Sequence, residues 1–140
     1  MKQKITLLFL LNLVAFLGYS QCSMEYSNDT QTLLGDFTTL KNYRIDGNGG
    51  SRKKIEYSAV LSKGNLYRMV VSSKDGEANG IVMSVYDAKK KLIVTNEIDN
   101  EQRRVRTFKV PANGIYYITF TFNNSSSYCG LSRLGVKKVD

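Results

Sequence analysis

Residues 115–122 read Ile-Tyr-Tyr-Ile-Thr-Phe-Thr-Phe and contain the clearest structural pattern in the chain. Successive side chains of a β-strand point to opposite faces of its sheet. Tyr116, Ile118 and Phe120 therefore share one face, and Tyr117 shares the other with the threonines. This alternation predicts a β-strand whose Tyr116 face is turned toward a hydrophobic core.

Similar segments occur on both sides of this strand and are separated by turns rich in glycine, asparagine and aspartate. The further expected strands cover residues 55–61, 66–73, 80–86, 91–95, 103–110 and 128–139. The chain has one proline and no long stretch of helical period. Many short strands with regularly spaced turns predict an all-β fold, an antiparallel β-sandwich of the jelly-roll type with about seven to eight strands.

The segment before these strands has a different pattern. Within residues 23–43, apolar side chains from Leu33 to Leu40 recur at helical spacing, and Asn28 or Asp29 can cap the start of a helix. Residues 46–51, Asp-Gly-Asn-Gly-Gly-Ser, have the composition of a flexible loop. We therefore expect one short N-terminal helix, followed by a glycine-rich loop, packed on the sandwich.

The start of the chain has the composition of a secretory signal peptide. Lys2 and Lys4 precede an almost unbroken apolar run over residues 5–17, and Gly18 and Ser20 are small residues before the expected cleavage. The run is shorter than a membrane span of about 20 residues. We expect a secreted or periplasmic protein with no transmembrane span after signal cleavage. The predicted organisation is a signal peptide over residues 1–20, the helix and loop over residues 21–50, and the β-sandwich over residues 51–140.

Two cysteines follow the predicted cleavage site, Cys22 and Cys129. In an oxidising compartment such a pair most simply forms one disulfide. The alternative is a lipid anchor on Cys22, but the preceding Tyr-Ser-Gln resembles a bacterial lipobox poorly. The disulfide is the favoured interpretation, and the lipid-anchored form remains the alternative.

The composition limits the classes of partner and of chemistry. The formal net charge of +8 falls to +6 when Lys2 and Lys4 leave with the signal peptide. Most basic residues are expected in turns and at strand edges, where charge is solvated. Export makes nucleic acid an unexpected partner and leaves an unknown protein or glycan, attracted over long range if it is anionic. The chain contains no histidine, so histidine-based triads and zinc sites are excluded.

Three polar loops, residues 74–79, 87–91 and 96–102, are the candidate binding surface, because rigid scaffolds commonly present binding residues on loops. Asp75, Glu77 and Asp87 supply the hard oxygen ligands that calcium prefers, so calcium is the one cofactor to test. The candidate ligand-contacting aromatic residues are Tyr43, Tyr86 and Tyr117.

Several motifs carry a resemblance to a known family. They are Tyr-Ser-Ala-Val-Leu at 57–61, Lys-Gly-Asn-Leu-Tyr at 63–67, Val-Tyr-Asp at 85–87 and Asn-Gly-Ile-Tyr-Tyr-Ile at 113–118. This half of the chain resembles the bacterial pre-peptidase C-terminal type of β-sandwich. The whole mature chain also resembles small exported bacterial proteins of unknown function that share a Cys-Gly…Leu-Gly element, here residues 129–135. The resemblance implies an exported bacterial β-sandwich.

The functional expectation is an exported, non-catalytic binding or accessory module of the bacterial envelope or extracellular space. The alternative is a structural or assembly component of a cell-surface complex, recognised through a sheet edge. A carboxylate-dependent hydrolase is the distant alternative, because it needs only a pair of acidic side chains.

Overall fold

The computed structural model of the chain describes Cys22 and residues 27–73 and 76–140. The predicted signal peptide, residues 1–20, lies outside this part of the chain. One helix, α2 (Ser27–Leu34), precedes the strands. The strands are β1 (Thr38–Asp46), β2 (Lys54–Leu61), β3 (Asn65–Ser73), β4 (Ile81–Tyr86), β5 (Leu92–Thr95), β6 (Glu97–Ile98), β7 (Glu101–Gln102), β8 (Val105–Phe108), β9 (Gly114–Phe122) and β10 (Cys129–Lys138). None of the described helices has the length and apolar character needed to cross a membrane.

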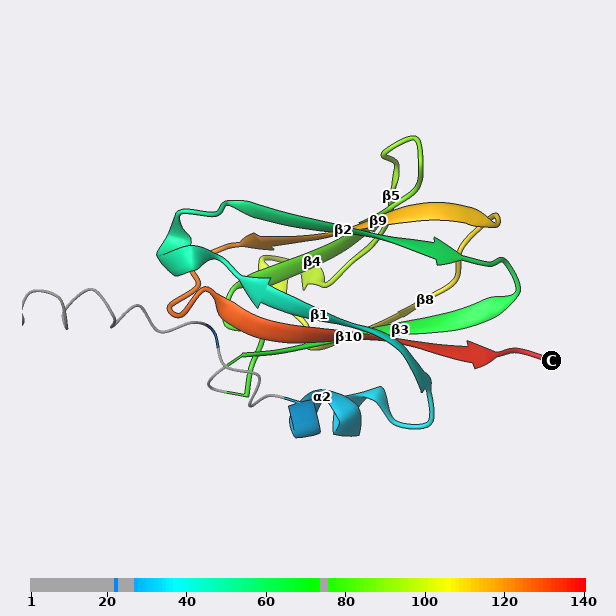
Figure 1. The fold of residues 1–140 in the computed structure, drawn as a ribbon, viewed down its shortest axis with the longest axis horizontal. Coiled ribbons are helices and arrows are strands. Elements are labelled where there is room, and N and C mark those ends of the chain that lie inside the picture. The colour runs from blue at the N-terminus through cyan, green and yellow to red at the C-terminus, as the bar shows by residue number, and fades with distance from the viewer. Residues whose placement is uncertain (1–21, 23–26, 74–75) are drawn as a thin grey trace, which may run out of the picture.

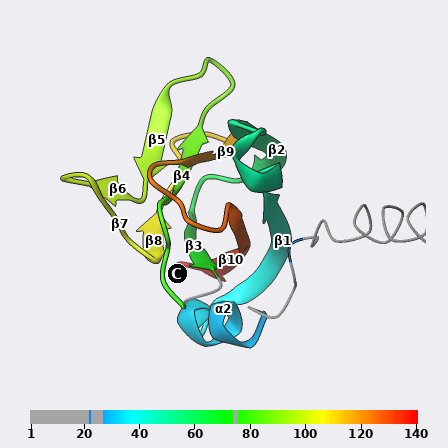
Figure 2. The same cartoon turned by 90° about the vertical axis from the view of Figure 1, so that its left-hand side faces the viewer.

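Two four-stranded antiparallel sheets form the layers of the fold (Figure 1). Sheet A has the strand order β1-β10-β3-β8, and sheet B has the order β2-β9-β4-β5. The short β6–β7 ribbon lies beside β5 and β8, whereas β1 and β2 form the edges on the other side (Figure 2). The predicted all-β antiparallel sandwich is therefore confirmed.

The core lies between the sheets and contains the predicted inner face of β9. Tyr116, Ile118 and Phe120 are all buried there, together with Tyr67 from β3. The outer face of β9 is less open than simple alternation suggests. Thr119 is only 4% exposed, because β9 is a central strand with neighbours on both sides.

The N-terminal segment contains less helix than the sequence predicts. The helix ends at Leu34, and Gly35 follows with φ 63°, a left-handed conformation that favours glycine and stops helices. The chain then forms β1, which pairs with β10. The predicted helical segment 23–43 was therefore wrong in its second half, and the strands of the sandwich start at Thr38.

The helix covers the outer face of sheet A. Leu34 and Phe37 bury Val70 there in a second small core. Gly135 of β10 permits this close packing, because a Cβ atom at that position would lie 2.6 Å from Leu34 Cδ1. The outer face of sheet B has no corresponding helix among the described elements.

Asn96, which directly follows β5, links β4 to the segment that leads to β8. Its side chain is fully buried. Its Oδ1 accepts the Met83 backbone N–H at 2.8 Å, and its Nδ2 donates to the carbonyl oxygens of Ile81 and Arg103, both at 3.0 Å. One side chain thus satisfies three backbone groups and connects the ends of β4, β5 and the segment leading to β8.

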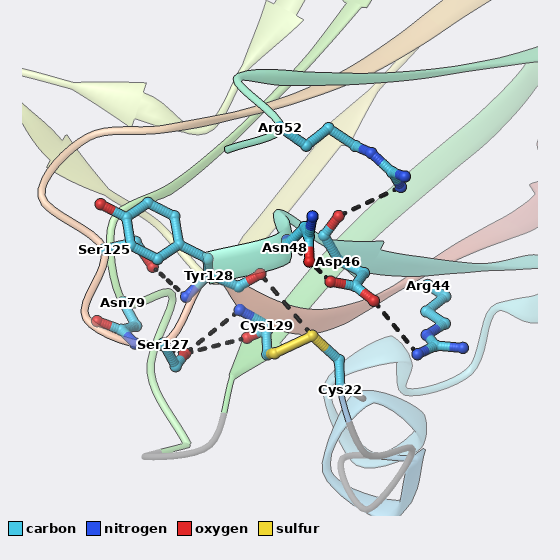
Figure 3. Close-up of a disulfide and its surroundings, with 10 residues drawn as sticks. All are labelled: Cys22, Arg44, Asp46, Asn48, Arg52, Asn79, Ser125, Ser127, Tyr128 and Cys129. Carbon is cyan, nitrogen blue, oxygen red and sulfur yellow. Dashed lines mark hydrogen bonds and ion pairs between the residues drawn. A yellow bond between two sulfur atoms is a disulfide. The ribbon is translucent and has the colours of Figure 1, made fainter. Parts of the chain in front are cut away.

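A disulfide joins Cys22 to Cys129, with Cα atoms 5.3 Å apart (Figure 3). It ties the segment before α2 to the first residue of β10 across 107 positions of sequence. A lipid anchor on Cys22 would need the same sulfur, so the two forms are mutually exclusive.

Replacing both cysteines by alanine should lower the free energy of unfolding by roughly 2 to 5 kcal/mol, because the bond closes a long loop in the unfolded chain. Urea unfolding of the oxidised and variant proteins measures the loss. Peptide mapping without reductant should recover the two cysteine peptides linked, and free thiols or a lipid on Cys22 would contradict the assignment.

Asn96→Ala should lower the free energy of unfolding by about 2 to 4 kcal/mol, because buried backbone groups lose their partners. Asn42→Ala, on an exposed position of β1, is the control and should change it by less than about 0.5 kcal/mol. Equal effects at the two positions in urea unfolding would show that Asn96 does not hold these strands.

Candidate binding surface

Two of the three acidic residues proposed as calcium ligands, Glu77 and Asp87, lie far apart. Asp75 lies outside the described residues. Glu77 precedes β4 and Asp87 follows it, so a six-residue strand of about 20 Å separates them. Asp87 Oδ1 instead accepts the backbone N–H groups of Lys89 and Lys91, both at 2.9 Å. Glu77 and Asp87 cannot ligate one ion, and no group of three potential metal ligands occurs in the described chain.

The three candidate loops do not share one end of the sandwich. Residues 76–79 and 96–102 adjoin the start of β4, near the disulfide, and residues 87–91 follow the end of β4. Antiparallel strands place successive turns at opposite ends. Whether these loops share one face is open from the sequence, and in the structure their described parts do not form one continuous surface.

Tyr43 is a core residue and cannot contact a ligand. It is 1% exposed, and its ring centroid lies 4.9 Å from that of Tyr57 and 6.1 Å from that of Phe120. Burial raises the pKa of Tyr43 to about 12, with a smaller contribution from Tyr57. Tyr43 ends the segment whose spacing predicts a helix, whereas in β1 it alternates with exposed residues and points inward.

Tyr86 and Tyr117 lie opposite each other on the outer face of sheet B, and both are half-buried. Lys90 covers the ring of Tyr117, with Nζ 3.4 Å from the ring centroid. The same ammonium lies 3.5 Å from Glu56 Oε1. This arrangement places the positive charge of Lys90 on the ring face of Tyr117, at the outer face of sheet B.

Lys90 belongs to a larger concentration of charge at one end of the molecule. Four segments, residues 62–64, 87–91, 109–113 and 136–140, define what we call the lysine-rich end. These segments are held close together: the Lys63 backbone N–H donates to Asn113 Oδ1 at 2.8 Å, and Lys138 pairs with Asn65, which follows the first segment. Residues of segments 87–91 and 109–113 line one pocket. The lysines of this end are Lys63, Lys89, Lys90, Lys91, Lys109, Lys137 and Lys138, against the aspartates Asp87 and Asp140.

The opposite end, which carries the disulfide, has the reverse balance. Its described loops, residues 46–53, 76–80 and 96–103, contain five carboxylates and three basic side chains. The fold is therefore electrically polarised along its strands. An anionic partner is attracted to the lysine-rich end.

Two depressions open at or beside the lysine-rich end. The end pocket, of about 230 Å³, lies between the β4–β5 turn and the β8–β9 loop, with Lys89, Pro111 and Ile115 in its lining. The side groove, of about 510 Å³, lies between the edge strands β1 and β2 and includes Leu40 and Val60. The larger volume is typical of a small-ligand or peptide site.

One rim of the side groove carries an ion pair between Asp36 and Lys137. A hydrogen bond from the Lys137 ammonium, together with its charge, holds the pKa of Asp36 below the usual value of 3.8. Lys138, the next residue of β10, also lines the groove and has no carboxylate within ion-pairing distance in the described part of the chain. An uncompensated ammonium therefore stands beside an apolar groove.

Comparison with known proteins gives likeness of fold only. No protein-family model matches the chain, and no curated protein matches its sequence. Among solved structures, Aeromonas hydrophila PliG, a periplasmic lysozyme inhibitor of g-type lysozyme, is 14% identical over 73% of this chain and 89% of that chain, with a TM-score of 0.47. The pre-peptidase C-terminal domain of a Bacillus anthracis collagenase is 17% identical over 72% and 89%, with a TM-score of 0.46. Salmonella Typhimurium PliG is 12% identical over 69% and 86%, with a TM-score of 0.41.

The lysine-rich end is not predictable from local sequence, because its lysines come from four separate segments and each looks like an ordinary solvated turn. The side groove is not predicted either. The available signal was Val60, an apolar residue on the polar face of an alternating strand. Such a residue is out of phase with its strand and is 75% exposed.

Lys137→Gln should raise the pKa of Asp36 toward 3.8, because the variant lacks the charge that stabilises the carboxylate. Since the folded-state pKa is lowered, the ion pair stabilises the fold at pH values above the ordinary pKa, and this contribution is lost as the pH falls through the lowered value. An NMR titration of the Asp36 carboxyl carbon measures the change. Lys138→Gln is the control, and an equal shift there would contradict the Asp36–Lys137 pairing.

Proposed function

We propose that this protein is an exported, non-catalytic binding module of the bacterial envelope or extracellular space, and that it binds an anionic polysaccharide at its lysine-rich end. The observation that carries the proposal is the convergence of seven lysines from four segments on one end of a rigid sandwich. Such a field raises the local concentration of a polyanion and orients its approach.

Export is supported by two independent features. The first residues have the composition of a signal peptide. The disulfide between Cys22 and Cys129 belongs to oxidising compartments, which lie outside the bacterial cytoplasm. A secreted or periplasmic location is therefore part of the proposal.

A polysaccharide fits this end better than a compact ligand. The lysines are spread over several turns, and the end pocket is shallow and small. Tyr117 and Ile115 continue the surface onto sheet B, and Lys90 lies between them and Glu56. A chain of charged sugars contacts several lysines at once, and apolar sugar faces pack against the adjoining side chains.

The non-catalytic part of the proposal is supported by the roles of the acidic residues near this end. Asp87 is held by backbone N–H groups, Asp36 is paired with Lys137, and Glu56 is paired with Lys54 and Lys90. Each of these three carboxylates serves a turn or an ion pair. A structural or assembly role is the second candidate, favoured by the two edge strands β1 and β2 on one side of the sandwich.

Replacing Lys89, Lys90 and Lys91 together by glutamine should lower affinity for dextran sulfate, a polyanionic probe, by at least about 10-fold, since each lysine near an anionic surface contributes about 1 kcal/mol. The matched control replaces Arg52, Lys53 and Lys54, which changes the net charge equally at the opposite end. We expect a loss of less than about 2-fold there, and weaker binding of the wild type at higher salt.

Equal losses in the two triple variants would show that net charge alone drives binding and would reject the lysine-rich end as the site. Polygalacturonate and neutral dextran complete the measurement, and binding of neutral dextran with similar affinity would also contradict the proposal. Thermal unfolding of each variant confirms that the fold survives.

A further inference from the structure

The side groove is lined by exposed apolar side chains, which have no role in the polysaccharide binding proposed above. It lies between the two sheets where β1 and β2 diverge, beyond the point at which the Tyr57 hydroxyl donates to the Arg44 carbonyl at 2.6 Å. Leu40 and Val60 line it and are 48% and 75% exposed, while Tyr67 and Val136 form deeper apolar lining. Exposed apolar side chains that gather in one groove are typical of an interaction site.

Both walls of the groove are edge strands, and their backbones differ. The register of β1 shifts between Thr39 and Lys41, which interrupts its edge at Leu40. The pairing of β2 with β9 is regular from Lys54 to Leu61. A regular edge strand presents a row of unpaired backbone groups that can accept another strand, whereas a bulge discourages pairing.

The charge at the groove indicates what kind of strand fits. Lys137 is already paired with Asp36, but Lys138 is not paired within the described residues. A carboxylate at the end of an extended chain complements this ammonium, and an apolar side chain next to it can pack against the groove lining of Leu40, Tyr67 and Val136.

We propose that the side groove binds the C-terminal segment of a partner polypeptide. The segment lies extended alongside β2, its last apolar side chain packs against Leu40, Tyr67 and Val136, and its terminal carboxylate pairs with Lys138. The neighbouring side chain of the segment points to the other face and packs against Val60. This is strand addition to a sheet edge, with backbone hydrogen bonds supplying affinity and the groove supplying specificity. The proposal does not depend on polysaccharide binding at the lysine-rich end.

The test uses the purified mature protein and two fluorescent hexapeptide pools with random internal positions. One pool ends in Leu, Val or Phe with a free carboxylate, and the other holds the same peptides as C-terminal amides. Affinity selection followed by mass spectrometry identifies retained peptides, and fluorescence anisotropy measures their binding. We expect retention of free acids, with at least about 10-fold weaker binding of the matching amides.

Val60→Asp and Lys138→Gln should each weaken peptide binding by at least about 10-fold. Leu92→Asp is the matched control, because Leu92 is an exposed apolar residue on the opposite edge strand of sheet B and lines neither depression. It should change binding by less than about 2-fold. The Lys89, Lys90 and Lys91 triple variant should keep peptide affinity, which separates this site from the polysaccharide site.

Failure of the wild type to retain free acids, or equal retention of acids and amides, would overturn the proposal. Equal losses in Val60→Asp and Leu92→Asp would do the same. Binding of decanoate in place of any peptide would identify the groove as an amphiphile site and would also reject the peptide. A variant that loses dextran sulfate binding but keeps peptide binding would support a peptide site that is separate from the polysaccharide site.

Discussion

Burial of alternate side chains between two four-stranded sheets is the constraint on which the rest of this molecule depends. Phe120, Ile118 and Tyr116 of β9 face Tyr67 and Met69 of β3 across one continuous core. A slip of one residue in either sheet would turn these rings outward and bring threonines or charged residues in. The core therefore holds the strand register. Gly135 leaves room for α2 to pack on sheet A, and the disulfide attaches Cys22 to β10.

Antiparallel register has an electrostatic consequence. Because each strand reverses the direction of the chain, turns that are neighbours in sequence lie at opposite ends of the sandwich. The lysine triplet at 89–91 meets Lys63, Lys109 and the lysines of β10 at one end, while Glu97, Asp99 and Glu101 lie with the other loops. The topology thus brings four ordinary basic segments together and gives one end of the sandwich a positive electrostatic potential. A sequence of the same composition in another topology would not be polarised in this way.

Local periodicity correctly predicts the strand at 115–122 and its buried face. The pairing of Cys22 with Cys129, expected from two cysteines in an exported chain, is also present. The helix prediction is wrong at residues 38–46, because the apolar residues from Leu33 to Leu40 keep a helical spacing across Gly35. Pairing with β10, which is distant in sequence, makes the chain extended there. Tyr43 was misplaced for the same reason. Asn96 gave no signal at all, since its role depends on three backbone groups that only the fold brings together.

The two edges on the open side of the sandwich are treated differently, and this difference bears on function. The β1 edge is interrupted by a bulge, and one of its carbonyl groups is occupied by Tyr57. The β2 edge is regular, and it carries Val60 at 75% exposure, where a charged residue would protect against unwanted pairing. Lys54 and Glu56 protect the other half of the same strand. Charged residues thus protect one half of the β2 edge, and the half beside the groove is apolar. A partner strand that pairs with this half explains the difference.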